Sequence, residues 1–261
     1  MVSSKVNATR KRANVIVMHD NAQLIFIDTP GLHDSKRVLN QFMMEEALKA
    51  IGDCDLILFL SPVTDSTKYY KEFLKLNKKN TPHILLLTKI DCVSNKKVLE
   101  KIDEFSKFDK NFLTLIPVST KKAHQNYLLD TLIKYIPHNP YFYDPEIITT
   151  ENIKDIYKEL IRESIFENIS KEIPYFSDVV IEKVQSLLEI EKIYAQIIVE
   201  KKSQKGVIIG KDGQTLKRVG KSARFLIEKF ANKKVFLKLF VVVKPNWSKD
   251  KKILSKLGYS I

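Results

Sequence analysis

The stretch Ile84-Leu85-Leu86-Leu87-Thr88-Lys89-Ile90-Asp91 joins four apolar residues directly to a polar loop. A short apolar run of this kind predicts a strand buried on both faces, as in a parallel sheet covered by helices. Similar runs recur at Val15–Met18, Leu24–Ile27, Leu56–Leu60 and Phe112–Val118. Helical patterns separate the runs, at Leu39–Ile51, Thr67–Leu76, Lys96–Phe105 and His124–Tyr135. The alternation predicts an α/β domain with a mostly parallel sheet.

The loop Thr88-Lys89-Ile90-Asp91 is a candidate binding site, because ligands of such sheets bind in the loops that follow the strands. The carboxylate of Asp91 can accept two N–H bonds from the Watson–Crick edge of guanine, while the stem of Lys89 lies over the base. Adenine would leave this carboxylate unpaired. The segment Lys101-Ile102-Asp103 has the same spacing but lies in a predicted helix, so we do not regard it as a site. The later loop Ser119-Thr120-Lys121 is placed to offer backbone N–H groups to the base.

A second candidate loop, Asp28-Thr29-Pro30-Gly31, directly follows the apolar run Leu24–Ile27. A carboxylate at a strand end can hold Mg²⁺, and the backbone N–H of a following glycine can approach a γ-phosphate closely. Taken alone, the same residues describe an ordinary turn. Three strand-end loops in this order and spacing together favour a guanine-nucleotide site over a turn.

The sequence contains no Gly-x-x-x-x-Gly-Lys-Ser/Thr segment, the loop that holds the phosphates of a nucleotide in this class of fold. The tripeptide Gly220-Lys221-Ser222 looks like its end, but Thr215 stands where the first glycine is required and the segment lies in a predicted helix. We therefore expect a domain whose first strand and phosphate-binding loop are missing. Without the N–H groups and the Lys of that loop, triphosphate binding and transfer should be much weaker.

Charge and proline content divide the chain. The segment 136–145 holds three prolines and reads as a linker. Residues 201–261 carry 17 Lys and Arg against 3 Asp and Glu, whereas residues 151–200 are net acidic. After the linker the patterns predict a helix (Ile153–Ser170), two strands (Asp178–Leu187 and Tyr194–Lys201), a helix (Asp212–Phe230) and a strand (Val235–Lys244). We expect domains at 1–137 and 151–261, joined by a linker at 138–150, the second domain being a small α+β unit.

The basic segment contains Gly210-Lys211-Asp212-Gly213, preceded by the apolar residues Ile208 and Ile209. A G-x-x-G turn between two helices lets a nucleic-acid strand approach the backbone closely, as in KH domains, and the preceding residues Val207, Ile208 and Ile209 are expected to face bases. The following helix carries four basic residues: Lys217, Arg218, Lys221 and Arg224. These features together predict single-stranded RNA binding, with an anionic lipid surface as the rival partner.

Composition excludes several classes of protein. The net charge of +13 predicts a polyanionic partner. Cys54 and Cys92 are too few for a disulfide framework or a tetrahedral zinc site, and we expect both to be small buried thiols. The start of the sequence carries no apolar signal segment, and no apolar run approaches a membrane span. The sequence therefore predicts a soluble intracellular protein.

Together these features resemble the Era family of GTPases, whose members join a GTPase domain to a C-terminal type II KH domain. Asn7-Ala8-Thr9-Arg10 is similar to the family's first switch segment, which makes Thr9 the Mg²⁺-binding threonine beside Asp28. Asp28 to His33 is similar to the second switch, with Leu32 in place of a catalytic glutamine. The chain departs from the family at Thr88, where Asn is usual, and at Thr120, where Ala is usual.

The resemblance implies GTP or GDP and Mg²⁺ as ligands, hydrolysis of GTP to GDP and phosphate, and binding to the RNA of the small ribosomal subunit during its assembly. It also implies a monomer in the cytoplasm with peripheral contact to the inner membrane surface. The alternative is a non-catalytic RNA-binding protein that keeps a degenerate remnant of a GTPase domain.

Overall fold

The computed structural model describes residues 9–10, 12–31, 38–121, 125–169 and 172–259. Contacts divide the chain into two compact units. The parallel-sheet unit contains residues 15–26 and 48–148. The mixed-sheet unit contains the described residues of 1–14, 27–47 and 149–261. Segments from both ends of the sequence therefore fold together in the mixed-sheet unit.

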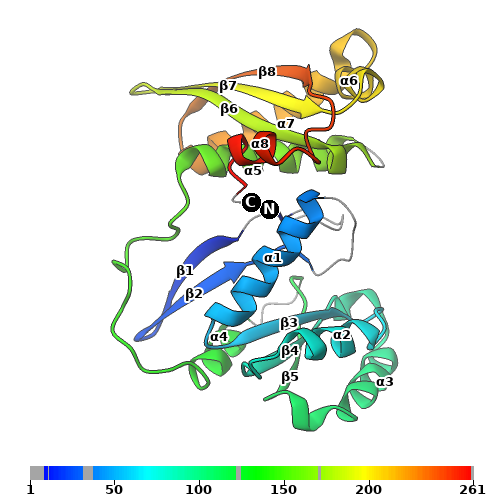
Figure 1. The fold of residues 1–261 in the computed structure, drawn as a ribbon. Coiled ribbons are helices and arrows are strands. Elements are labelled where there is room, and N and C mark those ends of the chain that lie inside the picture. Colours follow the sequence, from blue (N-terminus) through cyan, green and yellow to red (C-terminus); the bar gives the residue numbers. More distant parts are fainter. Residues whose placement is uncertain (1–8, 11, 32–37, 122–124, 170–171, 260–261) are drawn as a thin grey trace. The chain divides into compact units, whose positions relative to one another are not determined.

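The parallel-sheet unit is built on three strands in the order β3-β4-β5, which are β3 (Ile57–Pro62), β4 (His83–Thr88) and β5 (Leu115–Pro117) (Figure 1). Both pairings are parallel, as the sequence predicts. Three helices accompany them: α2 (Lys68–Leu76), α3 (Asn95–Ser106) and α4 (Gln125–Ile133). The central strand β4 is buried over five of its six residues. Its side chains Ile84 and Leu86 pack with Leu24, Ile116 and Leu132 in one apolar cluster.

The first two strands, β1 (Ala13–His19) and β2 (Ala22–Asp28), form a separate two-stranded sheet rather than part of the parallel one. The connection between them is only Asp20-Asn21, and Asp20 takes a positive φ of 49°. A two-residue connection makes a hairpin, because parallel neighbours need a long crossover. The expectation that every apolar run of the first half joins one mostly parallel sheet is thus wrong for this pair. The helix α1 (Val38–Asp53) follows.

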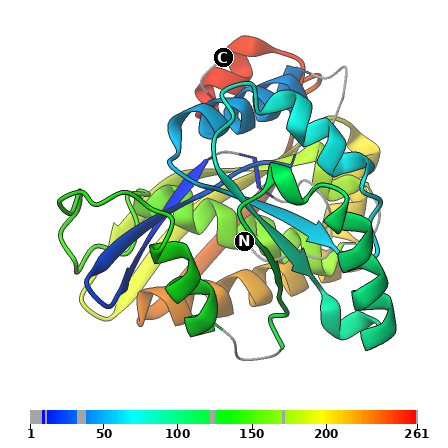
Figure 2. The same ribbon diagram turned by 90° about the horizontal axis from the view of Figure 1, so that it is seen from below.

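The mixed-sheet unit has the strand order β6-β7-β8, with β6 (Ser177–Ser186), β7 (Ile190–Val199) and β8 (Lys234–Val243). The pair β6 and β7 is antiparallel, and β7 pairs parallel with β8. The helices are α5 (Ile153–Asn168), α6 (Lys202–Ile209), α7 (Gln214–Ala231) and α8 (Lys251–Lys256). Figures 1 and 2 show α5 and α7 side by side on one face of this sheet. The described residues also form four single-turn 3₁₀ helices, at Ile90–Cys92, Asp109–Asn111, Ile173–Phe176 and Lys211–Gly213.

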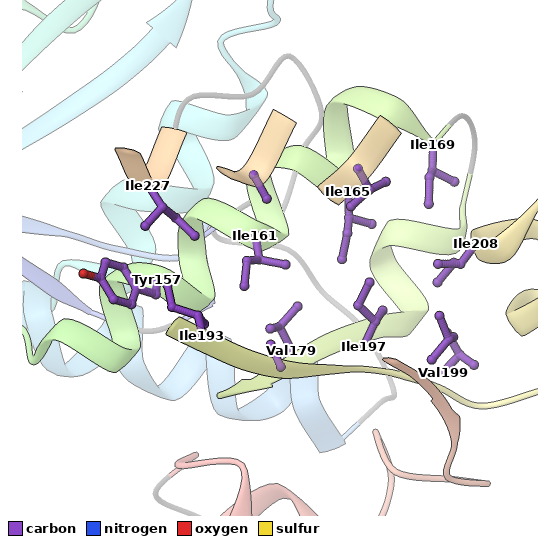
Figure 3. Packing of buried hydrophobic residues seen from close by; sticks show 14 of the residues in the cluster. Tyr157, Ile161, Ile165, Ile169, Val179, Ile193, Ile197, Val199, Ile208 and Ile227 are labelled. Atoms are coloured by element: carbon purple, nitrogen blue, oxygen red, sulfur yellow. The ribbon is translucent and has the colours of Figure 1, made fainter. Parts of the chain in front are cut away.

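The core of the mixed-sheet unit lies between the two helices and the sheet (Figure 3). On α5, the residues Tyr157, Ile161 and Ile165 recur every four positions and form one buried stripe. They meet the inward side chains of the strands, among them Val179 and Ile193. Alternate residues of each strand face this core, and the other set faces the opposite side of the sheet.

A second cluster of the same unit surrounds Trp247, whose side chain is fully buried. The Trp247 indole N–H donates to the carbonyl of Phe176 at 3.2 Å. The cluster joins Leu39, Phe42 and Met43 of α1 to side chains near the end of the chain: Leu254, Leu257 and Tyr259. The start of α1 is therefore packed on the C-terminal segment. Among the described helices, none is both long and apolar enough to cross a membrane.

Candidate functional site

Asp91 lies in the 3₁₀ helix that directly follows β4. Because β4 and β5 are parallel neighbours, with Leu87 opposite Pro117, the loops after them meet at the same edge of the sheet. The Ser119 hydroxyl donates a hydrogen bond to Oδ1 of Asp91 at 2.6 Å. The loops containing Asp91 and Ser119 thus lie together, as expected for adjacent parallel strands.

Lys121, the last residue of the third loop, also holds this carboxylate through its side chain, a contact that the sequence did not predict. Nζ of Lys121 lies 3.0 Å from Oδ2 of Asp91. Hydrogen bonds from Ser119 and Lys121 lower the pKa of Asp91 to about 2. The Lys121 side chain is 77% exposed and that of Asp91 only 14%. Each carboxylate oxygen has two lone pairs, so both oxygens keep capacity for a further donor.

The other residues of these loops are placed around Asp91 by the backbone. Thr88 is the last residue of β4, and its carbonyl accepts a hydrogen bond from the Val63 amide at 2.9 Å. Lys89 has a positive φ of 58°, which turns the chain out of the strand and leaves its side chain exposed. Ile90 is half-buried and Thr120 is exposed.

Thr9 and Asp28 form a second small site, in the mixed-sheet unit. The Thr9 hydroxyl donates to Oδ2 of Asp28 at 3.0 Å. Asp28 is the exposed last residue of β2. Thr29 is half-buried, Pro30 is buried and Gly31 is exposed. Leu32 lies outside the described residues. A hydroxyl and a carboxylate oxygen at this distance are the hard donor set that Mg²⁺ prefers, so these residues fit that ion.

Arg10, the residue after Thr9, is buried in the mixed-sheet unit and only 3% exposed. Its guanidinium donates to the carbonyls of Ser177 at 2.9 Å, Tyr175 at 3.1 Å and Pro174 at 3.3 Å. Its Nη1 also lies 3.6 Å from Oδ1 of Asp178. The sequence held no signal for this contact, because it joins residues far apart in the chain.

Asp178 is fully buried among cations. Nζ of Lys158 lies 3.2 Å from its Oδ2, the Tyr259 hydroxyl donates to the same oxygen at 2.9 Å, and Nε of Arg162 lies 3.8 Å from Oδ1. Burial by itself raises the pKa of Asp178, but Lys158, Arg10 and Arg162 outweigh it and lower that pKa to about 2. Oδ1 has no hydrogen-bond partner within the described part of the chain, so ion pairing with Arg10 and Arg162 is what compensates its burial.

The G-x-x-G turn joins α6 to α7. The sequence patterns predict α7 but miss α6. Three of its four residues have positive φ: Gly210 at 73°, Asp212 at 49° and Gly213 at 74°. A Cβ on Gly210 would lie 2.3 Å from Oγ1 of Thr215, so only glycine fits there. A Cβ on Gly213 would meet no atom within 4 Å, so the space beside this glycine is open. Lys211 and Asp212 are exposed.

The expectation that Ile208 faces bases is wrong. Its side chain is fully buried and belongs to the core of the mixed-sheet unit. The helix α6 packs this face on the sheet, which turns Ile208 inward, and Ile209 is half-buried against the same core. Val207, which belongs to the same expectation, is 49% exposed.

The four basic residues of α7 that the sequence singled out are all exposed: Lys217, Arg218, Lys221 and Arg224. Buried Val219, Ala223 and Ile227 form the opposite face of the same helix. Phe225 lies among the basic residues and is 65% exposed, a flat apolar side chain that the sequence did not mark.

The segments that we did not regard as sites are helical, as predicted: Lys101-Ile102-Asp103 lies in α3 and Gly220-Lys221-Ser222 lies in α7. Cys54 is half-buried and Cys92 is exposed, so the expectation of two buried thiols is wrong for Cys92.

Family models match both parts of the chain. A model described as a 50S ribosome-binding GTPase matches residues 1–89, and a model described as a KH domain matches residues 160–248. The class is therefore a GTPase domain joined to a KH domain.

Similar proteins narrow this class. GTPase Era of Campylobacter lari is 51% identical over 260 residues, which cover 99% of this chain and 89% of that protein. GTPase Era of Helicobacter pylori is 47% identical over 266 residues and 88% of its length. The chain belongs to the Era family of GTPases.

Two solved structures share the whole fold. A point variant of Aquifex aeolicus Era bound to GDP·AlF₄⁻ has a TM-score of 0.94 and 30% identity, covering 100% of this chain and 90% of that one. Era in complex with MgGDPNP and nucleotides 1506–1542 of 16S ribosomal RNA has a TM-score of 0.94 and 31% identity, with the same coverage. These comparisons do not favour a non-catalytic remnant. They also give no support to the expectation that the protein lacks a phosphate-binding loop.

Proposed function

We propose that this protein is a GTPase that binds small-subunit ribosomal RNA and acts in assembly of that subunit. The observation that carries the proposal is the similarity to GTPase Era over 99% of the chain, which includes both the strand-end loops and the G-x-x-G turn. Related Era structures hold guanine nucleotides, and one also holds a 16S RNA fragment.

Asp91 is the proposed reader of guanine. Its two oxygens would accept the N1–H and the 2-amino group of the base, a pattern that adenine does not offer. Lys89, at a positive φ, would lay its stem along the base, and Thr88, Ile90, Ser119 and Thr120 would line the base site. Ser119 supports this role because its hydroxyl holds Oδ1 of Asp91.

Thr9 and Asp28 are the proposed residues at the phosphate end of the nucleotide. Their paired oxygens would hold Mg²⁺, directly or through water, and the bound ion would neutralise charge on the phosphates. Gly31, which is exposed and has no side chain, would offer its backbone N–H to the γ-phosphate, next to Thr29, Pro30 and Leu32.

The RNA would bind at the G-x-x-G turn, where the open space beside Gly213 lets a sugar–phosphate backbone approach Gly210, Lys211 and Asp212. The exposed basic residues of α7 would contact phosphates (Lys217, Arg218, Lys221 and Arg224). Ile209, half-buried beside the turn, would border the site.

A monomeric state, a cytoplasmic location and peripheral membrane contact stay predictions. Gel filtration can test the monomeric state, and vesicle sedimentation can test the membrane contact.

The base-reading role is tested by the variant Asp91→Asn. The amide would place a donor where the guanine amino group needs an acceptor, so GDP binding should fall by roughly 100-fold while binding of xanthosine diphosphate, which has a carbonyl there, rises. Titration calorimetry with both nucleotides measures this, with Asp103→Asn in α3 as the control. An unchanged preference for GDP would show that Asp91 does not read the base.

The RNA-binding role is tested with the variant Gly213→Asp. The added carboxylate fills the open space and repels phosphate, so binding of a labelled RNA corresponding to 16S nucleotides 1506–1542 should fall strongly. The control is Glu100→Gln, an exposed change on α3. Equal binding by the Gly213→Asp variant and the unchanged protein would show that the G-x-x-G segment is only a turn.

A further inference from the structure

The sheet of the mixed-sheet unit has a second face, opposite α5 and α7. One end of this face is covered, because the outward side chains Val180 and Ile198 pack in the cluster around Trp247. Toward the start of β8 the outward side chains face solvent instead: Lys234, Phe236, Lys238 and Phe240 are all exposed. The covered end is already packed within the unit, whereas the uncovered end is open to solvent.

The uncovered end combines aromatic rings with lysines. Phe236 is 45% exposed and Phe240 is 46% exposed. Tyr194 of β7 lies beside Phe236, with ring centroids 6.1 Å apart. In the strand register, Lys192 is opposite Phe236 and Tyr194 is opposite Lys238. We call these six residues the aromatic–lysine face: Lys192, Tyr194, Lys234, Phe236, Lys238 and Phe240.

The charge of this face limits what can cover it. Glu191, the acidic residue of β7, points to the opposite side, where the Ser186 hydroxyl donates to its carboxylate at 2.7 Å. The aromatic–lysine face itself carries three lysines and no carboxylate. A partner must therefore bring both negative charge and flat apolar groups. Single-stranded RNA has both, in its phosphates and in the faces of its unpaired bases.

The two exposed phenylalanine rings are far enough apart for each to stack on a different base. Phe236 and Phe240 are four residues apart on one strand, about 13 Å at the usual rise. Lys238 lies between them on the same face. Nζ of Lys238 is 5.2 Å from the ring centroid of Phe240, a cation–π contact. A base stacked on Phe240 would replace this ammonium, which could then pair with a phosphate.

The strand that carries most of this face also contacts the helices beside the proposed RNA site. The strand β8 contacts both α6 and α7, the two helices that the G-x-x-G turn joins. Phe240 lies closer than Phe236 to the end of β8 that is level with Val199, just before α6 begins. Because α7 packs on the other face of the sheet and β8 is an edge strand, an RNA strand leaving the turn would reach the aromatic–lysine face by passing the edge at β8. Figure 1 shows β8 in this sheet and α6, which precedes the turn.

We propose that the aromatic–lysine face is a second surface for single-stranded RNA, which stacks bases on Phe236 and Phe240 and binds phosphates through the neighbouring lysines. The proposal rests on the RNA-binding function proposed above, but its residues are separate from the G-x-x-G turn. The turn holds a short stretch of RNA, and this face extends the contact to bases beyond it.

A tryptophan reporter tests stacking directly. The only native tryptophan, Trp247, is fully buried and gives a constant background. In the full chain, Phe240→Trp should show saturable fluorescence quenching on addition of an oligouridylate of about 12 nucleotides, a length that one single-strand-binding module can cover. The control is Phe142→Trp, at a 78% exposed position in the parallel-sheet unit, which should not be quenched. No quenching at Phe240→Trp, or equal quenching at both positions, overturns the proposal.

A matched set of binding measurements separates this face from the turn. In the Gly213→Asp background, the double change Phe236→Leu and Phe240→Leu keeps apolar volume but removes the rings. It should weaken residual oligouridylate binding by about 5-fold or more for each lost stack. Lys234→Gln with Lys238→Gln should instead flatten the salt dependence by about 0.7 for each lost phosphate contact. Unchanged melting temperatures confirm that each variant folds.

Each outcome decides between the two sites. If Gly213→Asp alone abolishes oligouridylate binding and the quenching at Phe240→Trp, the turn binds RNA and the aromatic–lysine face does not. If only the ring and lysine changes weaken binding, the face binds RNA and the assignment of the turn is wrong. If neither set has an effect, both assignments fail. RNA binding that survives loss of both rings and both lysines points to a protein partner on this face and overturns the proposal.

Discussion

At the scale of single residues, hydrogen bonds already orient the carboxylate of Asp91, the proposed acceptor for guanine. Ser119 and Lys121 keep it ionised, with the pKa lowered to about 2. The two supports differ in kind. Ser119 is part of the loop after β5, whereas the side chain of Lys121 is 77% exposed and can move away from an arriving base. Ser119 therefore orients the carboxylate, and Lys121 acts as a replaceable counter-ion.

Replacing Lys121 with Met tests this difference. We expect the pKa of Asp91 to rise toward its ordinary value, because one hydrogen bond and one charge are lost. GDP affinity should stay equal or increase, since no lysine then competes with the base. Carboxyl NMR titration and calorimetry measure the two effects, with Lys96→Met on α3 as the control. A large loss of GDP affinity would mean that Lys121 contacts the nucleotide itself.

The buried Asp178 links stability to pH. Its pKa of about 2 lies below the ordinary 3.8, so the ionised group stabilises the fold above the ordinary value and this contribution is lost as the pH falls toward 2. At neutral pH the ionised carboxylate of Asp178 therefore contributes about 2 kcal/mol to the free energy of unfolding. Unfolding free energies measured between pH 5 and 2 should decline more steeply for the unchanged protein than for Asp178→Asn. Parallel declines would show that Asp178 is not the linked group.

At the scale of elements, the G-x-x-G turn contains a residue that opposes its proposed role. Asp212 brings a negative charge to the expected phosphate path and holds a positive φ of 49°, which is unfavourable for most side chains. The turn keeps its shape because Gly210 and Gly213 take the other positive-φ positions. We therefore expect the negative charge of Asp212 to lower RNA affinity without being needed for the shape of the turn.

Asp212→Gly should therefore bind single-stranded RNA more tightly, by roughly 3- to 10-fold at low salt, because a repulsive charge is removed. Asp212→Asn is the matched control, since asparagine also tolerates a positive φ but carries no charge. Fluorescence anisotropy at two salt concentrations should rank both variants above the unchanged protein, with the gain shrinking at high salt. Weaker RNA binding by both variants would assign Asp212 a direct contact with RNA.

At the scale of the whole molecule, the local pattern of apolar residues predicts many of the strands and helices. It predicts few of the contacts between segments that are far apart in the sequence. The run Ile84–Leu87 predicts a strand buried on both faces, and β4 is one. The helix α6 is missed because it has only eight residues and contains Gly206, and Ile208 is misassigned because the face of a short helix is set by its packing. The Lys121–Asp91 pair and the burial of Arg10 depend on loops and on segments far apart in the chain, which periodicity cannot show.

Replacing Arg10 tests how much its contacts in the mixed-sheet unit contribute to the stability of the fold. Arg10→Ala removes three hydrogen bonds to carbonyls and leaves Asp178 with one cation fewer, so unfolding should become easier by about 3–5 kcal/mol. The control is Arg12→Ala, because Arg12 is 33% exposed and its Nε lies 3.4 Å from Glu46. Urea denaturation measures both variants. Equal, small losses would mean that the burial of Arg10 contributes little.

The packing around Trp247 determines what happens when the chain is cut. Residues 137–142 are exposed, so a protease should cleave there first. Yet Leu39 and Phe42 are buried with Trp247, and Arg10 is buried beside Asp178, on the far side of such a cut in sequence. The two pieces of the nicked protein should therefore co-elute on gel filtration and separate only in denaturant. The chain can thus be cut between the two predicted domains while its two fragments stay associated.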